Sequence, residues 1–367
     1  MDGTGNRTQR IDDLGTHTYD YDDLYRLTEV TYPGPANVDY TYDAVGNRLT
    51  MVTSAGTTDY DYDAADRLVS VDPPGASPMT YTWDDNGNLT ARGADSFVWD
   101  AEDRMTSATV ASLTTTFAYN GDGLRDSLTV SANTTTFTWD VNTSIPQVLD
   151  DEDFRYVYGL GLISMTDSSG VQSYRLTDGL GSTMALTDDD GDVVNTYDYD
   201  VFGADRASTG MHANDFTFMA QQFDSSTGLQ FLKARYYDPT AGRFLGRDRF
   251  GGSDLLPMSQ NAYAFAHANP ILWRDPLGLC IVVCKVNVPD PIGVVKKGLS
   301  DGAQKFAEVT GIDKGYVEIG ASGCGLPTLP LGPCRGCRCA IRWRFTSPIL
   351  GLWNGYHRVE RQCYCVP

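Results

Sequence analysis

The first 279 residues of this 367-residue chain contain no cysteine, and basic residues are scarce among them. They hold 17 lysines and arginines against 42 aspartates and glutamates. Because so acidic a surface repels phosphate backbones, we expect no nucleic-acid binding by residues 1–279. No run of 18 apolar residues occurs in the chain, so no transmembrane segment is predicted. The opening residues, Met1–Arg7, also lack the basic and apolar regions of a signal peptide.

Sequence motifs for metal or nucleotide chemistry are missing as well. The four histidines, His17, His212, His267 and His357, are scattered and show no metal-ligand spacing. Neither a phosphate-binding Walker loop nor an HExxH pair occurs. We therefore expect no cofactor in residues 1–279.

The last 88 residues differ in composition from the rest of the chain. Residues 280–367 hold 11 lysines and arginines against 6 acidic residues, and they carry all eight cysteines. Two compositions in one chain indicate two modules with different physical requirements. We place the join near residue 279.

A short aromatic signature recurs along the first 140 residues. Each copy has the form aromatic, any residue, aromatic, Asp or Asn, and successive copies end 21, 20, 21, 16, 20 and 20 residues apart. The copies are Tyr19–Asp22, Tyr40–Asp43, Tyr60–Asp63, Tyr81–Asp84, Phe97–Asp100, Phe117–Asn120 and Phe137–Asp140. A fixed period of this size indicates a repeat architecture.

Each repeat reads as a β-hairpin. Alternating Tyr, Trp, Thr and Val favour a half-buried strand, and the Asp that follows opens a turn completed by pairs such as Gly46-Asn47. A second short strand begins with Arg-Leu or Asn-Leu. One hairpin cannot bury its aromatic face alone, whereas a stack of hairpins builds a long sheet. The alternative is an ordinary β-sandwich with accidental spacing, which seven ordered copies disfavour.

The segment Tyr42–Thr50, with the sequence YDAVGNRLT, resembles the YD repeat of Rhs, toxin-complex C and teneurin proteins. The resemblance implies a mainly β fold in which stacked hairpins form a curled, spiral, shell-like sheet. We expect YD repeats in residues 1–153. Seven repeats are too few to enclose a large cavity, so we expect the chain to be the end of a longer protein or a truncated relative.

Denser motifs follow from about residue 154. They include Gly228–Pro239, Gly242–Asp248, Asn261–Phe265 and the terminal Asp275–Leu279, with the sequence DPLGL. In this order they resemble the Rhs-associated core domain, which we assign to residues 154–279. The resemblance implies an intramolecular aspartyl protease that cuts after DPxGL, here between Leu279 and Cys280.

Such chemistry needs two neighbouring carboxylates, one protonated and one able to activate water. Asp275, inside the hallmark motif, and Asp248, after Gly-Arg-Phe, are the candidates, and Asp254 is a third. Arg247 is a candidate to orient Asp248 or stabilise its charge. For each of these residues the alternative is a purely structural role, because most aspartates in so acidic a chain form turns or solvated charges.

The tail, residues 280–367, is expected to be a small, variable, cysteine-rich module. Its eight cysteines suit disulfides formed in an oxidising place. Alternatively, Cys334, Cys337, Cys363 and Cys365 form a weaker candidate zinc site, or the thiols remain free. The basic, aromatic stretch 335–345 suits nucleic acid or an anionic lipid surface, or equally a solvated edge strand. His357, together with Arg358 and Glu360, is a candidate nuclease-like cluster that contains a single histidine.

The sequence thus predicts a shell segment that encloses its own C-terminal tail and releases it as an effector. The partners expected are that tail as cargo, a secretion apparatus and a cognate immunity protein. Export would place the protein outside the cell or at the cell surface. The alternative is a structural or adhesive cell-surface YD-repeat protein that binds carbohydrate or protein and does not cleave itself.

Overall fold

The computed structural model describes residues 1–12, 14–34, 36–252 and 257–279, and the short strands 282–283, 337–340 and 362–365. The chain divides into two compact units, Met1–Leu279 and Cys280–Pro367. None of the helices among the described residues has the length and apolarity needed to cross a membrane.

The first sheet of the Met1–Leu279 unit has 14 antiparallel strands in chain order. Its strands are β1 (Gln9–Asp12), β2 (Gly15–Tyr21), β3 (Leu27–Tyr32), β4 (Ala36–Tyr42), β5 (Arg48–Thr53), β6 (Gly56–Tyr62), β7 (Leu68–Asp72), β8 (Met79–Trp83), β9 (Leu89–Arg92), β10 (Asp95–Trp99), β11 (Met105–Val110), β12 (Leu113–Tyr119), β13 (Arg125–Val130) and β14 (Asn133–Thr136). Every strand pairs with its neighbours in sequence, so the predicted stack of hairpins is confirmed.

A second sheet of eight strands follows, again in chain order. It contains β15 (Thr138–Asp140), β16 (Gln147–Asp150), β17 (Phe154–Tyr158), β18 (Leu162–Asp167), β19 (Gln172–Thr177), β20 (Thr183–Thr187), β21 (Val193–Tyr199) and β22 (Asp205–Thr209). The first sheet ends with β14, and the second sheet begins with β15. The expected domain boundary, between residues 153 and 154, falls where the turn after β16 leads into β17, and these two strands are neighbours in the second sheet.

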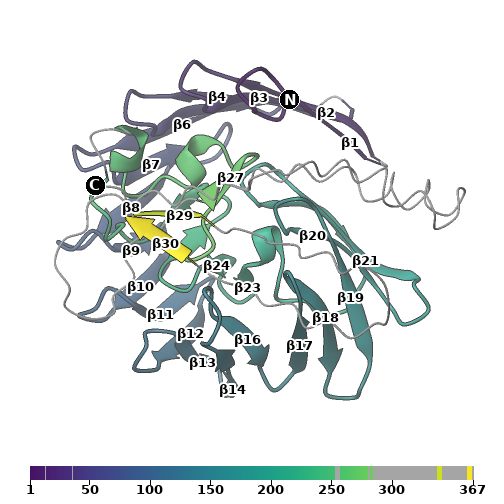
Figure 1. The fold of residues 1–367 in the computed structure, drawn as a ribbon. Coiled ribbons are helices and arrows are strands. Elements are labelled where there is room, and N and C mark those ends of the chain that lie inside the picture. Colours follow the sequence, from purple (N-terminus) through teal and green to yellow (C-terminus); the bar gives the residue numbers. More distant parts are fainter. Residues whose placement is uncertain are drawn as a thin grey trace, which may run out of the picture. The chain divides into compact units, whose positions relative to one another are not determined.

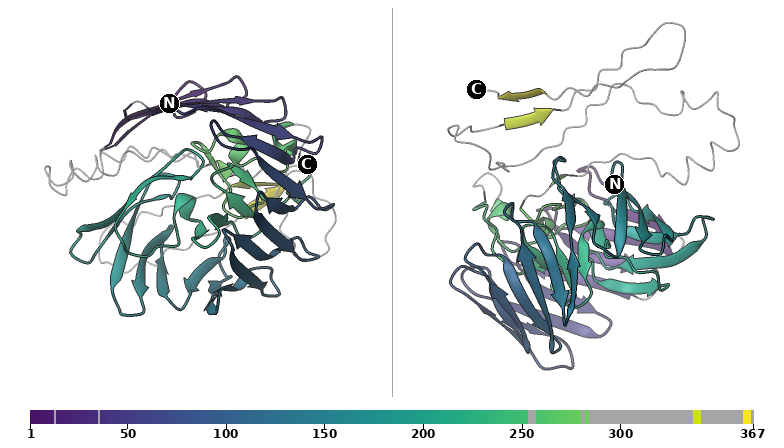
Figure 2. Two further views of the ribbon diagram at one scale, coloured as in Figure 1. Left: turned by 180° about the vertical axis from the view of Figure 1, so that it is seen from behind. Right: turned by 90° about the horizontal axis from the view of Figure 1, so that it is seen from below.

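The rest of the Met1–Leu279 unit is a small inner assembly. A four-stranded sheet contains β23 (Gln222–Asp224), β24 (Leu229–Phe231), β25 (Tyr236–Asp238) and β26 (Arg243–Phe244), and the remaining elements are η1 (Phe218–Ala220), η2 (Pro257–Gln260), η3 (Ala266–Ala268) and β27 (Trp273–Arg274). Figures 1 and 2 show the two long sheets as a curved wall with this assembly on its inner side.

The two aromatic residues of each repeat have different tasks. The first is buried in the core, as Tyr40 and Phe97 are. The second donates a hydrogen bond to a carbonyl oxygen of the preceding repeat: Tyr42 Oη to Leu27 O at 2.8 Å, and Trp83 Nε1 to Leu68 O at 2.7 Å. Because this position needs a polar donor, it is always Tyr or Trp, whereas Phe occurs only at the first position.

The Asp that closes a signature organises the turn that follows it in the chain. Oδ1 of Asp43 accepts hydrogen bonds from the backbone N–H groups of Val45 and Asn47, at 3.0 and 2.8 Å. Its Oδ2 accepts one from the Asn47 side chain at 2.9 Å, and the same amide also donates to Asp66 Oδ1 at 2.8 Å. This turn is therefore held internally and tied to the next repeat.

The core lies between the wall and the inner assembly. One cluster packs Leu68, Leu89 and Met105 of the wall against Leu229 and Phe231 of β24. A second surrounds Leu27 and Val30 of β3 together with Phe202 and Ile271, and a third lies under the second sheet. Burial of these apolar faces against the inner assembly allows a sheet of hairpins to curve around it.

The Cys280–Pro367 unit is described only as three short strands. They are β28 (Val282–Val283), β29 (Cys337–Ala340) and β30 (Gln362–Cys365). β29 and β30 pair antiparallel, with Cys337 opposite Cys365 and Cys339 opposite Cys363. Cys334 and the side chains of all the tail cysteines lie outside the described residues, so disulfides, zinc and free thiols remain open interpretations there.

Candidate active site

The site is built around Arg235, which lies in the turn between β24 and β25. The backbone N–H of Leu232 donates to the carbonyl of Arg235 at 2.9 Å, which closes the turn. Lys233 has a φ of 66°, a left-handed conformation that is rare outside glycine. The Arg235 side chain is buried, and its guanidinium lies 3.6 Å from the centre of the Phe244 ring. Turn geometry and ring stacking together fix the guanidinium.

Arg235 joins the two principal candidate carboxylates. Its Nη2 lies 2.8 Å from Asp248 Oδ2 and 3.3 Å from Asp275 Oδ2. Its other nitrogens donate to the carbonyl oxygens of Ala262, at 2.9 Å, and of Gly278. Three separate segments of the inner assembly therefore meet on one guanidinium.

Asp275 organises the DPLGL motif around itself. Its side chain is 1% exposed, and its Oδ1 accepts hydrogen bonds from the N–H groups of Leu277, at 3.3 Å, and Leu279, at 3.1 Å. The motif bends back because Gly278 has a φ of +69°. A Cβ on Gly278 would lie 2.9 Å from Leu232 O and 3.1 Å from Arg235 N. Only glycine fits this turn without displacing backbone.

Asp248 is the more accessible carboxylate, with a side chain 16% exposed. Burial raises the pKa of Asp248, and the charge of Arg235 opposes this shift. Its Oδ1 accepts a hydrogen bond from Phe250 N at 2.8 Å, and its own N–H donates to Ala262 O at 3.0 Å. The adjacent Arg247 is exposed, and the guanidinium that contacts Asp248 is that of Arg235.

The sequence-predicted residues are thus only partly brought together. Asp248 and Asp275 converge, and Leu279 reaches Asp275 through its N–H. Asp254 and Cys280 lie outside the described residues. Among those that are described, no three histidine, cysteine, aspartate or glutamate side chains gather in a way that would hold a metal ion.

Sequence reasoning missed Arg235, although the signal was present. It lies within the quoted Gly228–Pro239 segment, in the run Phe-Leu-Lys-Ala-Arg-Tyr-Tyr, where apolar neighbours predict burial. A buried arginine needs carboxylate or carbonyl partners. An arginine in such a run therefore points to buried acids elsewhere in the chain.

A pocket flanks the motif, with Pro276, Lys233 and Arg274 among its lining residues. Lys233 Nζ donates to Gln221 Oε1 at 2.9 Å. Burial lowers the pKa of Lys233 to about 8, and the negative charge of Asp275 opposes that effect. A second cation thus faces Asp275.

Comparisons with known proteins identify a family and several relatives for the chain. The family model described as Teneurin YD-shell matches residues 5–271. The chain is 32% identical over 203 residues to the tRNA3(Ser)-specific nuclease WapA of Bacillus spizizenii, covering 52% of this chain and 9% of that protein. It is 34% identical over 105 residues to the toxin protein Tse5 of Pseudomonas aeruginosa, covering 29% and 8%.

Two further similarities extend the comparison. The double-stranded DNA deaminase toxin A of Burkholderia cenocepacia is 35% identical over 108 residues, covering 28% of this chain and 7% of that one. The crystal structure of TcdB2-TccC3-Cdc42 aligns with a TM-score of 0.42 at 17% identity, covering 75% of this chain and 19% of that one. The chain spans less than a tenth of the length of each of these three relatives.

Proposed function

Since the chain belongs to the Teneurin YD-shell family, we propose that residues 1–279 are the closing part of a shell that carries the segment after Leu279 as cargo and frees it by self-cleavage. The observation that supports cleavage is the convergence of Asp248 and Asp275 on Arg235, with Asp275 bonded to the N–H of Leu279. The proposed scissile bond, Leu279–Cys280, directly follows that N–H group.

The environments of the two carboxylates suggest different roles. Two backbone N–H groups and Arg235 donate to Asp275, and such donors favour the charged form. Asp248 has a raised pKa and keeps a proton more readily. In the proposed reaction Asp275 takes a proton from a water molecule while the oxygen of that water attacks the carbonyl carbon of Leu279. Asp248 then gives its proton to the nitrogen of Cys280 as the peptide bond breaks.

The cargo role is supported by composition and by the relatives. Residues 1–279 carry 25 more acidic than basic residues, whereas residues 280–367 carry five more basic than acidic ones. A basic segment is attracted to an acidic wall. Named relatives include a nuclease and two toxins. Within this proposal, export delivers the protein outside the producing cell, and an immunity protein protects the producer.

Intact-mass measurement of the purified full chain tests cleavage. We expect wild type to yield a fragment ending at Leu279, and Asp275→Asn and Asp248→Asn to remain whole. Asp238→Asn is the matched control, because Asp238 is a buried inner-sheet carboxylate that contacts Arg92 at 2.6 Å, away from the motif. Circular dichroism melts verify that every variant is folded.

An uncut wild-type chain would refute the protease proposal and favour a non-cleaving structural or adhesive YD protein. Cleavage that persists in both Asp275→Asn and Asp248→Asn would assign the chemistry to other residues. The cargo role is tested by producing the wild-type chain and the Asp275→Asn chain in sensitive cells. Growth inhibition only by the cleavable chain is expected, and equal growth would contradict release of an active effector.

A further inference from the structure

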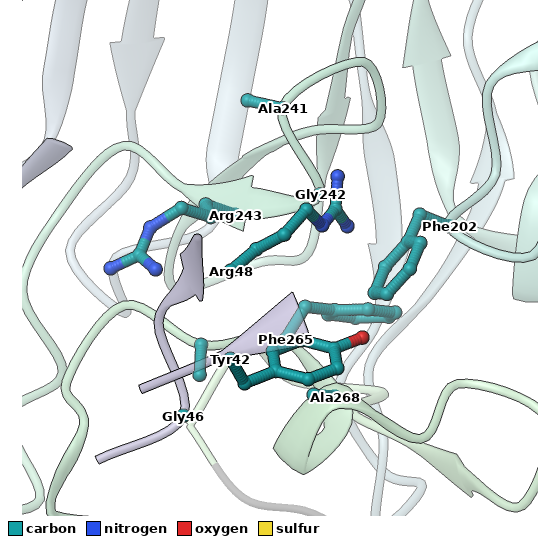
Figure 3. A pocket seen from close by; sticks show the side chains of 10 residues that line it. Tyr42, Gly46, Arg48, Phe202, Ala241, Gly242, Arg243, Phe265 and Ala268 are labelled. Atoms are coloured by element: carbon teal, nitrogen blue, oxygen red, sulfur yellow. The ribbon is translucent and has the colours of Figure 1, made fainter. Parts of the chain in front are cut away.

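A second, small pocket lies where β5 meets the loop before β26. Its lining includes Arg48, Arg243, Phe202 and Gly242, and none of its ten lining residues is acidic. Figure 3 shows Arg48 extending toward Gly242, with the Phe202 ring beside it. A small cavity with two arginines and no acid is an unusual arrangement for a protein interior.

The repeats themselves provide the comparison that makes Arg48 notable. In the first six repeats, the residue five positions after the closing Asp or Asn begins the second strand and points into the core. In four repeats this residue is apolar and buried, and in two it is a buried arginine. The apolar residues are Leu27, Leu68, Leu89 and Met105, and the arginines are Arg48 and Arg125.

Arg125 and Arg48 are held alike except for one group. The Arg125 guanidinium lies 4.5 Å from the Phe231 ring, and its Nη1 is 2.6 Å from Asp224 Oδ2. Arg48 is 6% exposed, and its guanidinium lies 4.1 Å from Phe202 and 4.9 Å from Tyr40. Nε has no hydrogen-bond partner in either arginine. Among the described residues, a carboxylate lies within 4.0 Å of the Arg125 guanidinium, whereas none lies within that distance of the Arg48 guanidinium.

A second buried arginine, Arg243, lies beside Arg48 in the lining of this pocket. Arg243 is also buried, and it donates to two neutral acceptors, Asn47 Oδ1 at 3.0 Å and Asp66 O at 2.7 Å. Asp200 attracts Arg48 from beyond ion-pair distance, and its Oδ1 is occupied by the N–H groups of Phe202 and Ala204, both at 2.8 Å. Two buried cations therefore share a region in which no carboxylate of the described residues directly contacts either of them.

We propose that this cavity binds a small free carboxylate, of the size of formate or acetate, on the guanidinium of Arg48. The anion would occupy the place that Asp224 takes at Arg125. A planar carboxylate matches the fork of N–H donors of a guanidinium. Gly242 keeps the fork open, because a Cβ there would lie 2.5 Å from Arg48 Nη2. This site is independent of the cleavage reaction and lies outside the DPLGL motif.

Thermal unfolding and titration calorimetry of the full chain with sodium acetate, at ionic strength held constant with sodium chloride, test the site. Wild type should be stabilised saturably. Arg48→Leu, which installs the residue of the equivalent repeats, should lose at least tenfold in acetate affinity. Arg67→Gln is the matched control, since it removes an arginine that pairs with Asp63 on the partly exposed edge, and it should respond like wild type.

The same acetate response in Arg48→Leu, or no saturable response in wild type, would overturn the proposal. An equal effect of chloride would contradict a site shaped for carboxylate. If Arg48→Leu does not fold, Arg48→Lys gives the comparison, because it keeps the charge and removes the planar fork. Undiminished acetate binding by Arg48→Lys would then overturn the role of the fork.

Discussion

Replacing Asp224 by asparagine removes the negative partner of Arg125 and leaves a buried positive charge uncompensated. The two side chains are 4% and 1% exposed and lie 2.6 Å apart. They join β13 of the first sheet to β23 of the inner assembly. The pair therefore connects the wall to the structure around which the wall curves.

The expected cost follows from this burial. Removing one partner of a buried ion pair destabilises a protein by about 3–5 kcal/mol, whereas replacing both with apolar groups is often close to neutral. We expect Asp224→Asn to fall in that range. The double variant Arg125→Leu/Asp224→Asn should recover most of the loss, since four other repeats carry an apolar residue at the Arg125 position.

Urea denaturation of the full chain, followed by tryptophan fluorescence, measures these differences as a double-mutant cycle. The control is Arg155→Gln, which breaks an exposed pair with Asp150 and should cost less than about 1 kcal/mol. Our reasoning would be refuted if Asp224→Asn cost no more than this control. It would also be refuted if the double variant were as unstable as Asp224→Asn alone.

Three further predictions concern the turns, a buried acid and the motif. Asp43→Ala should cost about 1–2 kcal/mol of unfolding free energy, because it removes the acceptor of three hydrogen bonds, whereas the exposed Asp23→Ala should cost almost nothing in the same denaturation experiment. Burial raises the folded-state pKa of Asp200 to about 6, so its contribution to stability is present at pH below about 4 and is lost as pH rises through 6. Measured from pH 4 to 7, wild type should lose roughly 2 kcal/mol relative to Asp200→Asn, and parallel curves would contradict this. Gly278→Ala forces a backbone displacement near Leu232, and intact-mass analysis should show slower cleavage than in wild type at equal folding.

Local rules determine the repeat part of the fold, which is why the sequence predicted it. The aromatic alternation, the Asp that caps each turn and the period of about 20 residues all act within one hairpin or between neighbours. For the same reason, the position five residues after the closing Asp could have been identified as core-facing from the sequence. The sequence also shows that Phe occurs only at the first aromatic position of a repeat and that the second is always Tyr or Trp. The cause of this difference is a hydrogen bond from the second aromatic residue to a carbonyl oxygen of the preceding repeat, about 15 residues away.

Sequence by itself determined the hairpin stack, the change of composition at residue 279 and the choice of Asp248 and Asp275 as candidates. Only the tertiary structure decided that Arg235 is the group joining them, because residues 235, 248 and 275 come together through packing of the inner assembly rather than through any local pattern. It also decided that Arg125 lies against a carboxylate, whereas Arg48 lines a pocket that has no acidic side chain. These two arginines hold equivalent places in their repeats. The groups that contact them, Asp224 at Arg125 and Phe202 at Arg48, come from segments about 100 or more residues away in the chain.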